Sequence, residues 1–333
     1  MMQTLKWGIL STAKIARTVM IPAMRTAAHA VPVAIASEHG KAVEVAREFG
    51  IPRAHDSFQA LLEDPEVEAV YIPLPNSLHA EWTIAAARHG KHVLCEKPAA
   101  LNLDEARRMQ QECNAYGVCL MEGYMYRQHP QHQRIRALLE EGVIGELRHV
   151  RGHFSFPLDL SAPSIKLDRQ LGGGSLNDVG CYPLDVIRRL LGMPEKVTIV
   201  GELDPYHDVD LTVSGILRFA EGRLAEFTSS FRQTLTHRYE LIGTRGRITV
   251  VRAFRPDKHD GEGLIMIHDG QGKPRSERLS ADQYPAQLDH FAAWVQGDNR
   301  HAADTGEVLA QASLIDACQR SMRSGRTEVP ETP

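Results

Sequence analysis

The chain has 333 residues, a formal net charge of −4 and 43% hydrophobic residues, a composition typical of a globular protein with one large or two ordinary domains. The acidic balance gives no electrostatic case for nucleic-acid binding, and no apolar run is long enough to span a bilayer. The N-terminal residues enter a strand pattern at once, without the layout of a signal peptide, so we expect a cytoplasmic protein with no nucleic-acid or membrane partner.

Short apolar strands and helices alternate through the first part of the chain. The strands are expected at residues 5–10, 31–37, 69–72, 92–95 and 118–121. The helices are expected at residues 13–27, 41–49, 57–63, 76–89 and 103–116. Continuous apolar strands separated by helices are typical of a parallel sheet covered on both faces. The pattern therefore predicts an α/β, doubly wound Rossmann domain over residues 1–122.

The second part, residues 123–333, is richer in strands. The strands are expected at residues 147–156, 197–201, 209–219, 223–231, 238–242, 247–251 and 263–268. The helices are expected at residues 131–141, 183–191, 288–295 and 307–321. Tight turns between successive strands predict a meander, and so an α+β domain with a mostly antiparallel sheet.

A strand, a turn and a helix over residues 7–17 have the layout of a dinucleotide-binding turn. The usual G-x-G-x-x-G fingerprint falls on Ser11, Ala13 and Ala16, so each glycine is replaced by another small residue. Hydroxyl groups add donors for a phosphate, and a helix N-terminus supplies N–H groups and a positive dipole. The residues expected to contact the cofactor here are Ser11, Thr12, Ala13, Lys14 and Ile15. An ordinary strand-to-helix turn has the same layout, and this segment alone leaves both interpretations open.

The end of the second strand is where NAD and NADP are distinguished. An acidic residue there accepts the ribose 2′-hydroxyl, whereas an arginine accommodates a 2′-phosphate. Ser37 is expected to line this site, Glu38 would repel a 2′-phosphate if it points inward, and His39 and Lys41 would attract one. The pattern therefore predicts NAD or NADP without deciding between them.

Two loops after later strands carry further candidates. Pro73 and Pro75 stiffen the loop after the strand at 69–72, where Pro73 is expected beside the cofactor, with Asn76 and His79 on the nicotinamide side. Asn76 is also suited to cap its helix, and the two roles are compatible. Glu96 and Lys97 directly follow the strand at 92–95, so they are expected at the carboxyl edge of the sheet, in contact with the cofactor.

A glycine triplet at 172–174 leads into Asp178 and Tyr182, which are four residues apart and share one face of a helical turn. An ammonium such as that of Lys97 and a phenol, once brought together, hold a substrate hydroxyl and move its proton. The simpler alternatives are a solvated surface lysine, and a flexible loop before a helix that holds a packed tyrosine.

Cysteines and histidines suggest no further chemistry. The five cysteines are odd in number and form no C-x-x-C pair, which favours free thiols in a reducing compartment. Cys95 and Cys181 flank the two motifs, but packing accounts for them more simply than nucleophilic catalysis. The pairs His129/His132 and His149/His153 lack a third ligand at a recognisable spacing, so no metal site is expected.

The segments 7–17, 71–79, 95–98, 121–127 and 172–182 together resemble the glucose–fructose oxidoreductase/inositol dehydrogenase (Gfo/Idh/MocA) family, over nearly the whole chain. Within it, the chain is most similar to the branch of aldose oxidoreductases and dimeric dihydrodiol dehydrogenases. The resemblance implies a Rossmann domain followed by an open-faced sheet that often forms the oligomer interface. It also implies that Lys97 and Tyr182 are the catalytic pair, with Asp178 beside them. The nucleotide turn without glycine departs from the family pattern, as does Glu38 where many NADP-using relatives have arginine.

These features predict an NAD(P)-dependent oxidoreductase that acts on a sugar or a related cyclic polyol. Tyr182 would take the hydroxyl proton, and Lys97 would bind the same oxygen and favour the tyrosinate, because a phenol normally titrates near ~10. Asp178 would orient the substrate or Lys97. Two alternatives remain: a catalytically silent, dinucleotide-sensing regulator, and a reductase of a dicarbonyl or anhydro sugar.

Few helices are left to cover both faces of the second sheet, so one face is expected to stay open. The alternate residues expected on it are Val213, Gly215, Leu217 and Phe219, or Leu224, Glu226, Thr228 and Ser230. Because a large exposed patch of this kind usually marks a protein interface, we expect a homo-oligomer, most simply a twofold dimer.

Overall fold

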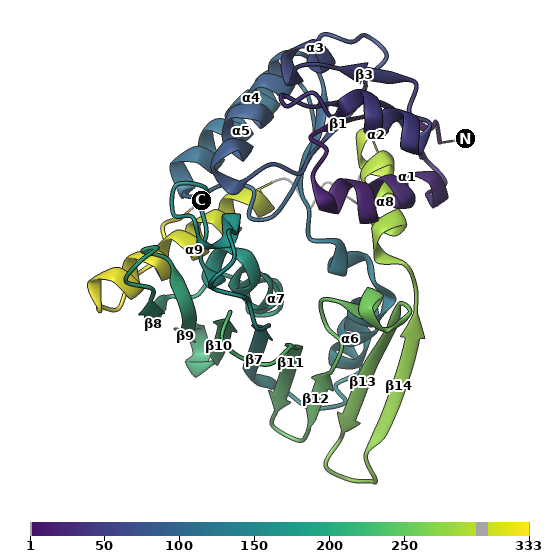
Figure 1. The fold of residues 1–333 in the computed structure, drawn as a ribbon. Coiled ribbons are helices and arrows are strands. Elements are labelled where there is room, and N and C mark those ends of the chain that lie inside the picture. The colour runs from purple at the N-terminus through teal and green to yellow at the C-terminus, as the bar shows by residue number, and fades with distance from the viewer. Residues whose placement is uncertain (1, 298–305, 333) are drawn as a thin grey trace. The chain divides into compact units, whose positions relative to one another are not determined.

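The computed structural model describes residues 2–297 and 306–332, and the chain divides into two compact units (Figure 1). The first unit comprises Met1–Met125 and Tyr284–Leu309, and the second comprises Tyr126–Gln283 and Ala310–Pro333. The sequence placed the domain boundary after residue 122, whereas the chain leaves the first unit at Met125 and later returns to it. Across the described ranges, no helix combines the length and the apolar character needed to cross a membrane.

The first unit is built on a six-stranded sheet in the order β3-β2-β1-β4-β5-β6, with every neighbouring pair parallel. Its strands are β1 (Leu5–Leu10), β2 (Ala30–Ala36), β3 (Arg53–His55), β4 (Ala69–Ile72), β5 (His92–Cys95) and β6 (Leu120–Glu122). Its helices are α1 (Ile21–Thr26), α2 (Ala42–Phe49), α3 (Phe58–Leu62), α4 (His79–Arg88), α5 (Leu103–Ala115) and most of α8 (Gln283–Val295). The predicted doubly wound parallel sheet is confirmed. Strand β3 was missed because it has only three residues, which are mostly polar and either half-buried or exposed.

The local sequence explains these elements. All four residues of β4 are buried, as expected for a strand covered on both faces. Ser57 and Asn102 cap α3 and α5 by accepting hydrogen bonds from the backbone N–H groups of Ala60 and Glu105. The prediction that Asn76 caps the next helix is wrong, because α4 begins at His79 after a 3₁₀ turn that itself starts at Asn76.

The helix α8 returns to the first unit far along the chain. The Phe291 ring on α8 lies 5.2 Å from the ring of Trp7 on β1. The Asp289 carboxylate accepts hydrogen bonds from the backbone N–H groups of Ala28 and His29, just before β2. This helix therefore covers part of the parallel sheet, a contact that no local pattern predicts.

The second unit is built on an eight-stranded sheet in the order β14-β13-β12-β11-β7-β10-β9-β8. Its strands are β7 (Leu147–Ser155), β8 (Lys196–Leu203), β9 (Asp210–Arg218), β10 (Leu224–Ser230), β11 (Thr236–Gly243), β12 (Arg247–Val250), β13 (Glu262–His268) and β14 (Arg275–Ser280). Its helices are α6 (Pro130–Glu140), α7 (Cys181–Leu191) and most of α9 (Glu307–Ser324).

The mostly antiparallel sheet is confirmed, but the uninterrupted meander is wrong. Strand β7 lies between β10 and β11, and it pairs parallel with β10 and antiparallel with β11. It therefore separates a meander of β8, β9 and β10 from one of β11 to β14. Strand β14, rich in charged residues, was also missed.

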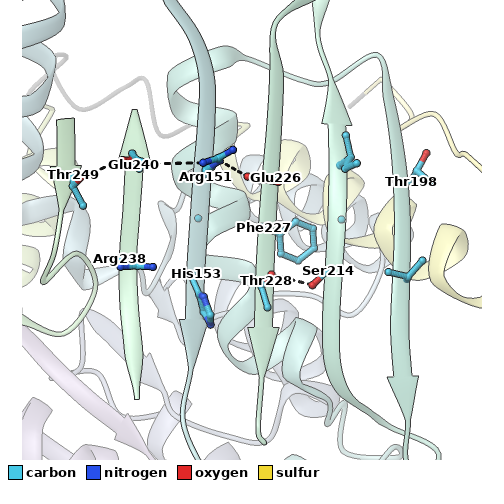
Figure 2. Close-up of a pocket in the computed structure, with 14 residues that line it drawn as sticks. Arg151, His153, Thr198, Ser214, Glu226, Phe227, Thr228, Arg238, Glu240 and Thr249 are labelled. Atoms are coloured by element: carbon cyan, nitrogen blue, oxygen red, sulfur yellow. Dashed lines mark hydrogen bonds and ion pairs between the residues drawn. The ribbon is translucent and has the colours of Figure 1, made fainter. Parts of the chain in front are cut away.

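One face of this sheet is covered by helices and the other is open, and Figure 2 shows the open face. The prediction for β9 chose the wrong alternate residues, because Val213, Leu217 and Phe219 are buried on the covered face. The open face carries Ser214 and Ile216 instead, across from Thr228 and Glu226 on β10. The alternative given for β10 is therefore right for Glu226 and Thr228 and for the exposed Leu224, but Ser230 is buried. A hollow of about 650 Å³ lies on this face.

Candidate active site

The turn after β1 is built without glycine because Ser11 adopts a conformation that glycine normally supplies. Ser11 has φ 147°, and its Oγ accepts a hydrogen bond from the Ala13 N–H at 3.0 Å. A left-handed φ costs a non-glycine residue roughly 1–3 kcal/mol, which such a hydrogen bond partly offsets. A π-helical turn at Ala16–Met20 follows, and π turns are frequent at functional sites. The turn thus keeps the tight geometry for which the fingerprint uses glycine.

The structure brings the candidate cofactor residues of the first unit to one edge of its sheet. Ser11, Ser37, Pro73 and Glu96 directly follow β1, β2, β4 and β5, which are parallel neighbours. Strand order reverses between β1 and β4, and ligands of doubly wound sheets bind outside the carboxyl ends at that point. Around the turn itself, Lys14 is exposed, and the residues that are half-buried are Ser11, Thr12, Ala13 and Ile15. This donor set and its placement fit a dinucleotide.

Glu38 is held at the start of a helix. Its Oε1 accepts a hydrogen bond of 2.8 Å from the backbone N–H of Phe58, the first residue of α3. Ser37 is buried directly at the end of β2, and its Oγ accepts a hydrogen bond from the His39 N–H at 3.3 Å. The residue directly at the end of β2 is therefore the small, buried Ser37, while the Glu38 carboxylate accepts a hydrogen bond at the start of α3.

His79 connects the loop after β4 with the loop after β5. It is fully buried, with Nδ1 2.8 Å from the carbonyl oxygen of Pro98 and Nε2 2.9 Å from that of Leu74. Burial, and to a lesser extent the Lys97 ammonium, lowers the pKa of His79 to about 4. The neutral ring carries one N–H and so donates to one of these carbonyls at a time. Its direct contacts are structural and fix the backbone that follows Lys97.

The backbone around Lys97 is also fixed from the other side. The Tyr71 hydroxyl donates a hydrogen bond of 2.7 Å to Glu96 Oε1, and the Lys97 N–H donates to Glu96 Oε2 at 3.2 Å. The Lys97–Pro98 peptide bond is cis. Glu96 and Lys97 are both half-buried at the end of β5. Lys97 is thus a half-buried cation, on a rigid loop, at the ligand-binding edge of the sheet.

In the second unit, the glycine triplet makes room for the buried carboxylate of Asp210. Gly174 has φ +107°, and a Cβ added to it would lie 2.3 Å from Asp210 Oδ1. Asp210 Oδ2 accepts hydrogen bonds from the Ser175 hydroxyl at 2.8 Å and the Leu176 N–H at 2.7 Å. Burial raises the pKa of Asp210 in spite of these bonds. Asp210 therefore anchors the start of the π-helical turn Leu176–Gly180, which carries Asp178.

Tyr182 follows at the start of α7 and is packed into a cluster of aromatic rings. Its ring centroid lies 5.2 Å from that of Phe154 on β7, 5.4 Å from Phe254 and 5.9 Å from Tyr126. The residue is buried but not completely enclosed, and the π turn leads directly into its helix. The ring orientation is thus set by packing on three sides.

A buried ionic network holds the next turn of α7. The Asp185 carboxylate pairs with Arg127 and Arg188, at 2.6 and 3.0 Å, and accepts a short hydrogen bond from the Tyr126 hydroxyl. Burial opposes ionisation, but the two guanidinium groups outweigh it and hold the pKa of Asp185 well below its usual range. Gln311 on α9 links Arg188 to the Cys181 carbonyl. Arg127, at the edge of the candidate motifs, therefore supports the helix of Tyr182.

Asp178 forms an ion pair that the sequence did not suggest. Its Oδ2 lies 2.5 Å from Nζ of Lys166, in the 3₁₀ turn Ile165–Leu167. The two residues stand on either side of the glycine triplet. Sequence reasoning also missed Asp185 and Asp210. Each is an acidic residue within an apolar segment, and this placement was the only signal in the sequence that they are buried.

Two of the cysteines and two of the histidines singled out in the sequence make structural contacts. Cys95 and Cys181 are fully buried, and burial raises the pKa of the Cys95 thiol well above its usual range. His129 and His132 contact backbone carbonyl oxygens of the same unit. Within residues 2–297 and 306–332, no group of three or more histidine, cysteine or acidic side chains is arranged to hold a metal.

Comparison with known proteins agrees with this architecture. Residues 5–124 match the model of an oxidoreductase family with an NAD-binding Rossmann fold, and residues 132–249 match the GFO/IDH/MocA C-terminal domain. The chain belongs to the GFO/IDH/MocA oxidoreductase family. It is 37% identical to a D-xylose 1-dehydrogenase (NADP⁺) of Haloferax volcanii, over 96% of this chain and 98% of that protein. It is 34% identical to mouse trans-1,2-dihydrobenzene-1,2-diol dehydrogenase, over 99% and 91% of the two chains.

A solved structure extends this comparison to cofactor and ligand. A 3-ketoreductase from Actinomadura kijaniata, in complex with NADP and TDP-benzene, superimposes with a TM-score of 0.89 and 32% identity, over 96% of this chain and 98% of that one. Structures of the same ketoreductase also exist with a tyrosine replaced by phenylalanine and with a lysine replaced by alanine or glutamate. The protein is thus a member of a family of NAD(P)-binding dehydrogenases and reductases that act on hydroxyl or keto groups.

Proposed function

We propose that this oxidoreductase moves a hydride between a nicotinamide cofactor and a hydroxyl or carbonyl carbon of a sugar or cyclic polyol. The observation that carries the proposal is Lys97, a half-buried cation on a fixed loop at the ligand edge of the parallel sheet. The xylose and dihydrodiol dehydrogenases among the relatives support the substrate class. Residues 1–122 would bind the dinucleotide, and residues 123–333 would bind the substrate and a second subunit.

The bound nicotinamide supplies the redox step by accepting or giving a hydride. Tyr182 would take the proton from the substrate hydroxyl in the oxidation direction and return it in the reduction direction. Lys97 would donate a hydrogen bond to the same oxygen and favour the ionised phenol, because a nearby cation stabilises the tyrosinate. Asp178 would orient the substrate or Lys97. The tyrosine and lysine variants made of the related ketoreductase support this choice of residue types.

The contacts around the first sheet support the cofactor assignment at the level of single residues. The Ser11 turn, Ser37, Pro73 and Asn76 would line the dinucleotide, while His79 would act by holding the loop of Lys97. The choice between NAD and NADP stays open, since Ser37 is neither acidic nor basic. The five free cysteines support a reducing, cytoplasmic location.

We also propose that two copies pair through the open face of the second sheet. Apolar side chains there are strongly exposed: Val200 is 69%, Ile216 is 57% and Leu224 is 41% exposed. Beside them, Arg151 pairs with Glu226, so the face offers both apolar and charged groups to a copy of itself (Figure 2). Light scattering after size exclusion should give twice the mass of one chain, and Ile216→Lys should halve it. A single-chain mass for the unmodified protein across a dilution series would contradict this dimer.

The function is tested by turnover and binding together. Aldoses, inositols and dihydrodiols are assayed with NAD and NADP by the absorbance of the reduced nicotinamide, and cofactor binding is followed by its fluorescence. Tyr182→Phe should lower turnover about 10²–10⁴-fold with cofactor affinity nearly unchanged, and Lys97→Met should lower turnover similarly. Near-normal turnover of Tyr182→Phe would refute the proton-transfer role. Cofactor binding without turnover on any substrate would favour the silent dinucleotide-sensing regulator.

A further inference from the structure

Lys166 and Asp178 form an ion pair across the glycine triplet. Lys166 Nζ lies 2.5 Å from Asp178 Oδ2, and the two side chains are 33% and 17% exposed. The same ammonium lies 5.5 Å from the centroid of the Phe156 ring, a cation–π contact that restricts where it can go. Asp178 itself stands one turn before Tyr182 along the π and α7 helices. The carboxylate that the proposed function uses is therefore held by a cation at hydrogen-bond distance.

The backbone of Lys166 is fixed as well as its side chain. The Lys166 carbonyl oxygen accepts a hydrogen bond from the Gly174 N–H at 2.9 Å, and the Gly173 N–H donates to the Asp168 carbonyl at 2.8 Å. A Cβ on Gly173 would lie 2.5 Å from the Lys166 carbonyl oxygen, so only glycine permits this approach. The loop from Lys166 to Asp178 is thus closed by backbone and side-chain bonds together. This preorganisation lowers the entropic cost that usually makes a partly exposed ion pair weak.

A neighbouring ion pair shows what a purely structural contact on this segment looks like. Arg169, three residues after Lys166, pairs with Asp208 in the loop between β8 and β9. Both of these side chains are at least half exposed. Arg169 and Lys166 therefore anchor the same segment, Arg169 through Asp208 and Lys166 through the candidate catalytic carboxylate of Asp178.

We propose that Lys166 is a positioning residue for the reaction, which holds the Asp178 carboxylate in one orientation. The inference rests on the proposed function, because it assumes that Asp178 orients the substrate or Lys97. Lys166 acts through Asp178 and does not itself contact the reacting atoms. Because a charge-assisted hydrogen bond is stronger than a neutral one, its loss should lower kcat/KM about tenfold to a hundredfold.

The test is a double-mutant cycle on kcat and KM with the full-length protein. Lys166→Met should lower kcat/KM about tenfold to a hundredfold, and Lys166→Arg should restore most of it, since arginine keeps the charge. Asp178→Asn should lower kcat/KM, and the double variant Lys166→Met/Asp178→Asn should be no worse than Asp178→Asn alone. NADPH or NADH affinity, by fluorescence titration, should stay unchanged in each variant.

Arg169→Met is the matched control, and it should leave kcat/KM within about twofold, in the range of surface substitutions away from a site. Equal losses in Arg169→Met and Lys166→Met would mean that Lys166 only anchors the segment, and would overturn the proposal. Additive losses in the double variant would overturn it too, while leaving the proposed function in place. Full activity of Asp178→Asn would overturn this role of Lys166 and leave hydride transfer with Lys97 and Tyr182 in place. No turnover by the unmodified protein on any substrate would overturn the proposed function as well.

Discussion

The contact between Gly174 and Asp210 allows a stability prediction with a matched control. In Gly174→Ala, the new Cβ would lie 2.3 Å from Asp210 Oδ1 and 3.0 Å from its Cγ, so the carboxylate must move. Asp210 then loses at least one of its bonds to the Ser175 hydroxyl and the Leu176 N–H. A hydrogen bond to a charged group contributes about 1.5–3 kcal/mol. The φ of +107° adds a backbone cost of roughly 1–2 kcal/mol for any non-glycine residue.

Gly325→Ala isolates the backbone cost. Gly325 lies in the same unit with φ +66°, and an added Cβ would meet nothing within 4 Å. We expect Gly174→Ala to be about 2–3 kcal/mol less stable than Gly325→Ala, which lowers the urea midpoint by about 1 M more. Urea titration followed by circular dichroism measures both. Equal midpoints for the two variants would refute the reasoning that Asp210 requires glycine at 174.

Two further predictions concern the cofactor and acid stability. Ser37→Asp places a carboxylate at the end of β2, so the ratio of NADPH to NADH affinity should fall at least about tenfold, measured by fluorescence titration; an unchanged ratio would mean that Ser37 does not face the ribose. His79 and His237 have folded pKa values lowered to about 4, and His132 to about 3, by burial above all. The unfolded chain binds these protons near pH 6.5, so the stability present above that pH should be lost as the pH falls from about 6.5 towards 4. Urea titrations at stepped pH measure this slope of the free energy of unfolding against pH, and His132→Asn should flatten it. A slope of the opposite sign would contradict the prediction.

The parallel sheet could be predicted because its signal is local. Strand β4 is a short apolar run, and helices with clear starts follow such strands, so alternation alone indicates the doubly wound class. Lys97 was found for the same reason, since it stands directly after an apolar strand. The open face of β9 was assigned to the wrong residues because both alternate sets contain apolar groups. Val213 and Leu217 turn inward, while Ile216 lies exposed with Ser214, and only the position of the covering helices decides between them.

The residues that the sequence did not reveal act through partners that lie far along the chain or across a turn. Asp210 is an acidic residue among apolar ones at the start of β9. Its burial is explained by the hydrogen bonds that the Ser175 hydroxyl and the Leu176 N–H donate to it. Lys166 carries no motif, and its partner Asp178 follows a glycine triplet that would by itself suggest a flexible loop. The triplet is instead closely packed. The Lys166 carbonyl oxygen approaches the backbone at Gly173, and the Asp210 carboxylate approaches it at Gly174. These glycines thus allow the close contacts that hold the segment leading to Asp178 and Tyr182, as the proton transfer proposed for Tyr182 requires.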